Sequence, residues 1–300
     1  MDPHELERYL SETWEFEDPE ASYDAFRTAS DAAEDGSAAG LVLRTQMARA
    51  QGLRSDFSDA QTILDAVARE LDAAGDSIGE QQHHHVRARL EIERGRLLNS
   101  SGSAAASRPH FDTAYDEAMA ADLAGLAVDA LHMTAIVIGS TDGPASAEAV
   151  NARAISVAEN SDDPEARRWL GSLLNNQGWN RHDAGAFEEA LAIFRRAVEV
   201  RQQQGSKRET AIAHWCVGRC LRSLERYSEA LEIQEMLASS PAGSADGYVY
   251  EELGENLMAL GRETEASTYF SRAHELLSQD DWLVDNESER LERLLTLSDD

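Results

Sequence analysis

The 300-residue sequence is long enough for about two ordinary domains, but its charge is unusual. It has 56 acidic and 27 basic side chains, a formal net charge of −29, and a single lysine, Lys207. Such a negative field repels phosphate backbones and anionic lipids, so the composition argues against nucleic acid and membrane as partners. A high-salt cytoplasm and a GC-rich genome that encodes arginine in place of lysine explain this composition equally well.

The N-terminal segment MDPHELERYLSETWEFEDPE is acidic and has neither the basic start nor the apolar stretch of a secretory signal. No apolar run near eighteen residues is evident, so we expect a cytoplasmic protein. A hydrophobic content of 42% with only six prolines fits an ordered chain, and the Ala-, Leu-, Glu- and Arg-rich segments favour helix. Runs of alternating β-branched residues are absent from the sequence, which predicts an all-α fold.

Residues 1–40 are expected to form N-terminal helices, because DPEASYDAFRTASDAA (residues 18–33) follows a short first helix. Residues 41–164 are expected to contain degenerate repeats. The clearest repeat there has Gly95, Gly102, Phe111 and Ala114, and Pro109 should delay or bend its second helix. Weaker repeats surround Ala48 and Ala135, and their alignment to the repeat pattern can shift by a residue or more.

Three consecutive histidines, residues 83–85, precede the helix of the Gly95 repeat. Neighbours on a helix point about 100° apart, so three in a row cannot all reach one metal ion. We interpret them as a solvated helix start.

Residues 165–277 contain the best-matched repeats. Their small residues Gly178, Gly218 and Gly254 are spaced by 40 and 36 residues. A small residue lets the first helix of a pair approach its partner closely, and Gly261 ends the helix that contains Gly254. Ala266, Phe270 and Ala273 then form an apolar stripe on the returning helix. Each helix pair leaves one apolar face uncovered, and stacking the pairs buries it.

The last of these units, Tyr250-x2-Leu253-Gly254-x2-Leu257 followed by Gly261 and Ala266-x3-Phe270, resembles the tetratricopeptide repeat. The resemblance implies an α-solenoid of stacked antiparallel helix pairs, with about five to seven repeats over residues 1–300 as a single domain. Residues 278–300 would form the capping helix. It further implies a concave face that binds other proteins or peptides, and it brings no catalytic residue.

Helical spacing from the small residue assigns positions on each first helix to the concave groove. We select as candidate ligand-binding residues Arg49, Arg89, Arg96, Asn99, His132, Asn175, Trp179, His182, Trp215, Arg219, Arg222 and Tyr248. In this hypothesis arginines bind carboxylates of an extended acidic peptide and tryptophans clamp apolar side chains. In the alternative, the arginines pair with acids of neighbouring helices and the tryptophans pack between repeats.

The leading interpretation is a non-enzymatic scaffold or adaptor that needs no cofactor and no metal. Two alternatives are a regulatory receptor for a small signal peptide and a metal-dependent hydrolase built around His182 and Asp183. An isolated His-Asp pair is common by chance. Cys216 and Cys220 lie one helical turn apart and are expected to be packed thiols. Trp14, Trp169 and Trp282 are expected to pack, and an imperfectly capped end leaves a homodimer possible.

Overall fold

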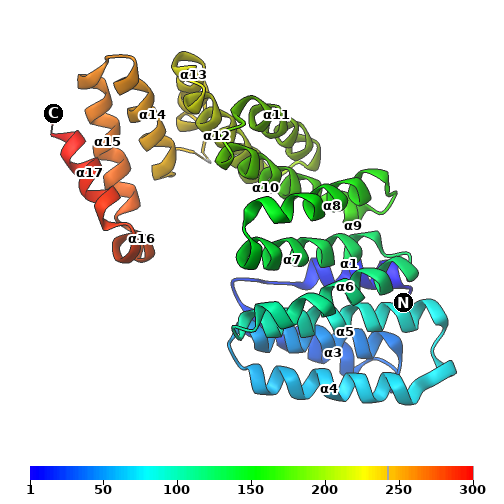
Figure 1. The fold of residues 1–300 in the computed structure, drawn as a ribbon. Helices are drawn as coiled ribbons and strands as arrows, with labels where there is room; N and C mark the ends of the chain where they lie inside the picture. Colours follow the sequence, from blue (N-terminus) through cyan, green and yellow to red (C-terminus); the bar gives the residue numbers. More distant parts are fainter. Residues whose placement is uncertain (242, 300) are drawn as a thin grey trace. The chain divides into compact units, whose positions relative to one another are not determined.

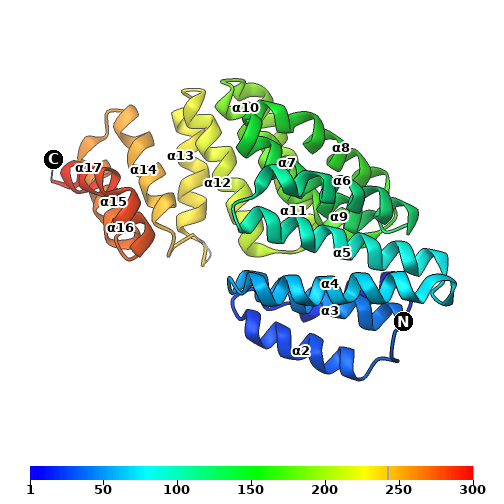
Figure 2. The same cartoon turned by 60° about the horizontal axis from the view of Figure 1, so that its bottom comes forward.

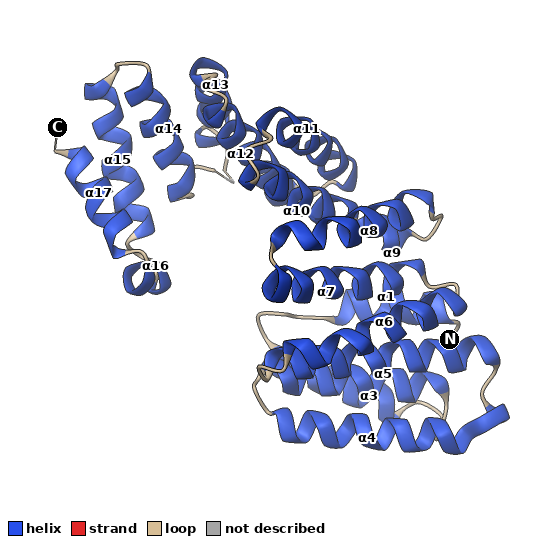
Figure 3. Ribbon diagram, viewed as in Figure 1, coloured by secondary structure: helices blue, strands red, loops and turns tan. Residues whose placement is uncertain are grey.

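The computed structural model describes residues 1–241 and 243–299, and every regular element within them is a helix (Figure 3). The all-α prediction is therefore confirmed for the described chain. The contacts divide the protein into two compact units, Met1–Leu173 and Leu174–Asp300. The prediction of a single solenoid domain over residues 1–300 stays a prediction.

The first unit consists of consecutive antiparallel helices (Figure 1). In chain order these are α1 (Pro3–Thr13), α2 (Pro19–Asp31), α3 (Ala38–Leu53), α4 (Phe57–Ala74), η1 (Gly75–Ser77), α5 (Glu80–Ser100), α6 (Ala104–Ala120), α7 (Ala124–Asp142), η2 (Pro144–Ala147), α8 (Glu148–Asn160) and α9 (Pro164–Arg168). The pairs α3/α4, α5/α6 and α7/α8 pack together, and α5 also contacts both α3 and α7. The first helices of the pairs therefore form one inner layer.

The second unit begins within a helix and repeats the same arrangement (Figure 2). Its elements are α10 (Leu170–Asp183), α11 (Phe187–Gln204), α12 (Lys207–Ser223), α13 (Tyr227–Ala238), α14 (Gly247–Ala259), α15 (Glu263–Leu277), α16 (Asp281–Asn286) and α17 (Ser288–Ser298). The sequential neighbours from α11 to α15 pack together, and α12 contacts α14 across the inner layer.

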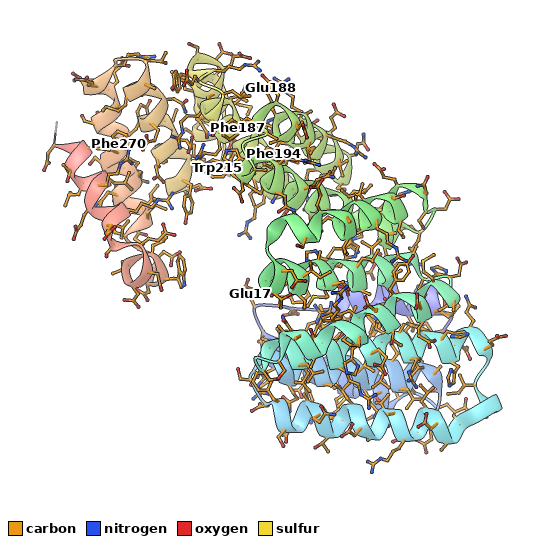
Figure 4. The ribbon with its side chains drawn as sticks, viewed as in Figure 1. Glu17, Phe187, Glu188, Phe194, Trp215 and Phe270 are labelled. Carbon is orange, nitrogen blue, oxygen red and sulfur yellow. The ribbon has the colours of Figure 1, made fainter. Side chains whose placement is uncertain are left out.

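The predicted small residues are points of closest approach between the two helices of a pair. Three of these glycines each face a buried phenylalanine ring sixteen residues later: Gly95 with Phe111, Gly178 with Phe194, and Gly254 with Phe270. A Cβ atom at any of the three would lie 2.4, 2.5 or 2.6 Å from a ring carbon. Phe194 and Phe270 are labelled in Figure 4. Close helix approach thus requires glycine at these positions.

The turns between paired helices share one left-handed residue. It lies seven residues after the small residue and is Gly102, Gly185 or Gly261 in three pairs, with φ of 86°, 76° and 74°. Ser55 and Glu225 occupy the same place with φ of 65° and 58°, which fixes the register of the repeat around Ala48. In the Ala135 repeat the left-handed residue is Gly143, one position later, and the short helix η2 follows.

Two expectations about helix boundaries are wrong. Pro109 neither delays nor visibly breaks α6, which begins at Ala104 and continues through it. The proline lies in the second turn, so its missing N–H removes one early hydrogen bond only. The C-terminal cap is two helices, because α16 precedes α17, and α17 buries Leu291 and Leu294. Trp282 on α16 is 59% exposed and does not pack as expected.

One helix corrects the expectation that no apolar run is long enough to cross a membrane. By length and composition α7 qualifies, but 61% of its most apolar window is buried inside the fold. The core helix of a repeat array has the same composition. This observation is therefore weak support for a membrane span.

Substituting alanine at a contact glycine should destabilise the protein. We expect Gly254→Ala to lower the free energy of unfolding by about 1–3 kcal/mol, because the new methyl group overlaps the Phe270 ring. The matched control is Gly52→Ala in α3, where the nearest atom, Leu97 Cδ1, is 3.9 Å from the new Cβ. That change should stabilise the helix by up to about 1 kcal/mol. Urea denaturation followed by circular dichroism measures both, and equal stability of the two variants would contradict the packing account.

Gln234 replaces the phenylalanine in the repeat of Gly218, and its buried side-chain amide makes no hydrogen bond at either Oε1 or Nε2. We expect Gln234→Leu to raise the free energy of unfolding by about 1–3 kcal/mol, because it removes two unsatisfied buried polar atoms. The exposed Gln202→Leu is the control and should change stability little. A decrease in the melting temperature of Gln234→Leu would show that the amide is satisfied in solution.

Candidate ligand-binding surfaces

The second unit brings four of the candidate aromatic residues into one row. The ring centroids of Trp179 and His182 on α10 are 5.0 Å apart. Trp179 lies 6.1 Å from Trp215 on α12, and Trp215 lies 6.3 Å from Tyr248 on α14. Trp215 is labelled in Figure 4. The first helices of three consecutive repeats thus present one aromatic row, and its role as a ligand-binding surface stays a prediction.

The two candidate arginines beside this row differ in how far the chain itself uses them. Arg222 binds Glu252 through two parallel hydrogen bonds of 2.8 Å each. Arg219 donates one hydrogen bond of 2.6 Å to Ser223 Oγ and has a longer ion pair of 3.4 Å with Glu252. Burial and the positive charge of Arg222 lower the pKa of Arg219. Arg222 is therefore paired with an acid of a neighbouring helix, as the alternative interpretation expects. Arg219 retains N–H donors for a ligand.

A cavity of about 410 Å³ lies beside the row, between α12, α13 and α14. Its walls include Ile212, Trp215, Leu237 and Val249, and Arg208 and Tyr248 also line it. Ile212 is 42% exposed although it is aliphatic. The size and the mainly apolar lining suit one or two side chains of a ligand.

Two other candidate residues of α10, Asn175 and His182, contact side chains of α12. Asn175 Oδ1 accepts a hydrogen bond of 3.2 Å from Cys216 Sγ. Burial raises the pKa of Cys216 to about 12 and that of Cys220 to about 11, so both are packed thiols. His182 Nε2 lies 2.9 Å from Ser223 Oγ. Burial lowers the pKa of His182, and the positive charge of Arg219 lowers it further. Within residues 1–241 and 243–299, no group of three His, Cys, Asp or Glu side chains is arranged to hold a metal ion.

In the first unit, the candidate arginines on α5 are held by carboxylates of the chain. Arg96 binds Asp129 through Nη2 at 2.6 and 2.7 Å, and it binds Glu93 through Nη1 at 2.6 Å. Arg89 forms a two-pronged ion pair with Glu7 of α1, in which Nε lies 2.8 Å from Oε1. Both guanidinium groups are therefore paired with buried acids of the chain, as in the alternative interpretation, and ligand binding at Arg89 and Arg96 stays a prediction.

Three other candidates in this unit have different surroundings. Arg49 lies over the rings of Trp14 and Phe16, 4.9 and 5.2 Å from their centroids, and burial together with Arg96 lowers its pKa to about 10. His132 packs 5.2 Å from Trp169, and burial lowers its pKa. Asn99 is half-buried near the end of α5.

The interpretation of residues 83–85 as a solvated helix start is wrong for His85. This residue is buried, and its Nε2 lies 2.7 Å from Glu7 Oε1. His84 also has a partner, since its Nδ1 lies 2.6 Å from Glu117. Glu7 and His85 are the site residues that sequence reasoning missed. The structure shows a capping box of Asp2 and Glu5 at the start of α1, and this pattern is a sequence signal for the helix but not for what the helix contacts.

Comparison with known proteins agrees with the fold. A family model described as Tetratricopeptide repeat matches residues 169–238. No curated protein matches the chain. Among solved structures, the apo form of RapI superposes with a TM-score of 0.70 at 12% identity, over 93% of this chain and 76% of that chain. Residues 169–238 therefore match the tetratricopeptide repeat family, and the fold over most of the chain is that of a tetratricopeptide repeat solenoid.

Two further structures show the same repeat architecture. The apo form of the quorum sensor NprR from B. thuringiensis has a TM-score of 0.55 at 13% identity, with 91% of this chain and 86% of that chain covered. A signal transduction ATPase with a tetratricopeptide repeat sensor, from Pyrococcus horikoshii, has a TM-score of 0.71 at 10% identity. The superposition includes 92% of the present chain but only 41% of the ATPase chain. At these identities the likeness establishes the fold alone.

The buried carboxylate of Glu7 predicts a pH dependence of stability. Burial alone would raise the pKa of Glu7, but Arg89 and His85 more than offset this and lower it from 4.5 to about 2. The folded-state pKa is depressed, so the stabilisation is complete above pH 4.5 and is lost as the pH falls toward 2. We expect wild type to exceed Glu7→Gln in stability at pH 7 by on the order of 3 kcal/mol. Denaturation from pH 7 to 2 should show this difference shrinking below pH 4.5; a constant difference would contradict the ion pair.

Proposed function

We propose that the protein is a non-enzymatic scaffold or adaptor that binds a segment of another protein along the inner face of its second unit. The observation that supports this most directly is the aromatic row from Trp179 through Trp215 to Tyr248, together with the adjoining cavity. Aromatic side chains at the centre of a depression are the usual anchors of protein interfaces. A fold that presents such a row on rigid helices is suited to protein or peptide binding.

Helix α12 defines the chemistry of the ligand. Arg208, Ile212, Trp215 and Arg219 follow one another at spacings of four, three and four residues, so they lie on one face of α12. The cavity at Ile212 and Trp215 accommodates an apolar side chain. No ion pair involves Arg208 within the described residues, and it provides a cation at the rim. The proposed ligand is therefore an extended acidic segment with one apolar anchor.

A receptor for a short signal peptide is a second candidate for the same surface. It is favoured by the fold likeness to NprR, a quorum sensor, and to the repeat sensor of the ATPase. The two candidates differ in the ligand, because a free peptide has its own charged termini and a segment within a protein has none. Blocking the termini of a bound peptide weakens binding only if the receptor function is correct.

Peptides selected from a random display library on the full chain should have an acidic residue next to an apolar one. We expect Ile212→Glu to weaken their binding at least ten-fold, because it places a charge against the anchor, and Arg219→Met to weaken it several-fold. Fluorescence anisotropy with labelled peptides measures both. Arg272→Met, on the exposed ion pair with Glu275 of α15, is the matched control and should leave affinity unchanged. Peptides that bind Ile212→Glu and wild type equally would contradict this surface.

A further inference from the structure

The N-terminal segment of residues 3–16 lies on the inner layer of the first unit. Glu7 contacts His85 and Arg89 of α5, and Ser11 Oγ accepts a hydrogen bond of 2.7 Å from Arg168 at the end of α9. Trp14 Nε1 donates to Gln46 of α3 at 3.0 Å. In Figure 1, α1 is seen between the ribbons of α6 and α7. One short segment thus contacts the first helices of two repeats, α3 and α5, and the end of α9, and Arg89 is one of the candidate ligand-binding residues.

The contacts of this segment are those of an acidic, amphipathic ligand. Leu6 and Leu10 are 2% and 1% exposed and pack into the apolar core of the first unit. Glu7 lies between them in the sequence and contacts His85 and Arg89 on α5. The opposite side of α1, which includes Glu5, Arg8 and Glu12, is exposed. Two aliphatic anchors with a carboxylate between them therefore define what this groove binds.

Several properties distinguish α1 from the repeats around it. It has 11 residues, which is too short for a stable isolated helix in water. It has no paired helix of the kind that α3 has in α4, and residues 14–18 join it to α2. A buried ion pair with Glu7 contributes little net stability compared with an apolar contact, but it specifies one partner and one register. These are properties of a docked segment.

We propose that α1 is an internal ligand of the first unit, and that the groove beneath it binds a helix of a partner protein with a carboxylate between two aliphatic side chains. The partner helix displaces α1 and takes over its contacts with His85 and Arg89. This binding site is separate from the surface of the second unit and does not depend on the function proposed for it.

Displacement also uncovers a second cation. Trp14 and Phe16 cover the guanidinium of Arg49, which forms no hydrogen bond or ion pair within the described residues. A cavity of about 170 Å³ lies next to it, lined among others by Arg49, Arg96 and Glu93. An additional acid of the partner, located beyond its second aliphatic residue, would meet Arg49 there. The partner is thus expected to be more acidic than α1.

Hydrogen exchange of the full wild-type chain tests whether α1 opens independently. The backbone amides of residues 7–13 should exchange at least ten-fold faster than those of residues 88–97 in α5, because α1 undocks without unfolding the unit. Mass spectrometry of peptic fragments resolves the two helices. Equal protection would mean that α1 opens only with the whole unit and would overturn the proposal.

A labelled synthetic peptide of residues 1–17 tests the groove itself. Wild type should bind it weakly, because the tethered copy competes at high effective concentration. The full-length Leu6→Ala/Leu10→Ala variant should bind it at least ten-fold more tightly, since its own α1 has lost both anchors. We call the Leu6→Ala/Leu10→Ala protein the loosened variant. Its binding should fall at least ten-fold when the peptide carries Glu7→Gln. Adding Arg89→Met to the loosened variant should weaken binding to the same extent.

The matched control is Leu291→Ala/Leu294→Ala, which removes two buried leucines from α17 in the second unit. It should bind the peptide as weakly as wild type. A loosened variant that keeps its helical circular dichroism but does not bind the peptide would overturn the proposal. Sedimentation of wild type should show a monomer. A dimer in which two copies exchange α1 would mean that the groove binds a second copy of this chain, and it would overturn the proposal of a different partner protein. If the loosened variant unfolds, the hydrogen-exchange result decides.

Discussion

Contact between a backbone glycine and a phenylalanine ring orients the helix pairs that contain Gly95, Gly178 and Gly254. At Gly178 and Gly254 the ring of the second helix lies where a Cβ atom would be, so the first helix is drawn against it. The side of the first helix opposite this contact then faces away from its partner. Because a small residue, glycine or alanine, recurs at this place in successive repeats, the same side is exposed in each, and the first helices together form a continuous inner layer within a unit.

The two units use this inner layer in different ways. In the first unit the polar positions are satisfied internally: Arg96 with Asp129, and Arg89 with Glu7. In the second unit Trp179, Trp215 and Tyr248 form a row beside the ion pair of Arg222 with Glu252, and an apolar cavity lies next to them. The same architecture therefore supports an occupied groove and an open one. Buried charges in the first case require a carboxylate at one position of the occupant, whereas aromatic surfaces in the second accept a range of apolar anchors.

The excess of acidic residues restricts where an acidic ligand can bind this protein. A carboxylate-rich surface repels other acidic segments at a distance, so an acidic ligand can bind only where cations are concentrated. Arg208 and Arg219 on α12, and Arg49 and Arg89 on the inner layer of the first unit, are such places. The chain already provides one acidic occupant in Glu7. Specificity then results from short-range pairing at a few positions within a repulsive field.

The sequence alone determined the helical class, the repeat unit and the direction of the inner face. Gly254, Gly261 and Phe270 act within one repeat, and their spacing is a local property of the chain. Helical spacing also placed Trp179, Trp215 and Tyr248 among the candidate groove residues, and the structure places them in one row. The sequence did not reveal that α1 lies against α5, nor that Arg96, Arg89 and Arg222 are paired. Those contacts join residues 30 to 82 positions apart, as for Arg222 with Glu252 and Arg89 with Glu7. Many acids satisfy the charge of an arginine equally well, so only the tertiary structure decided which one it meets.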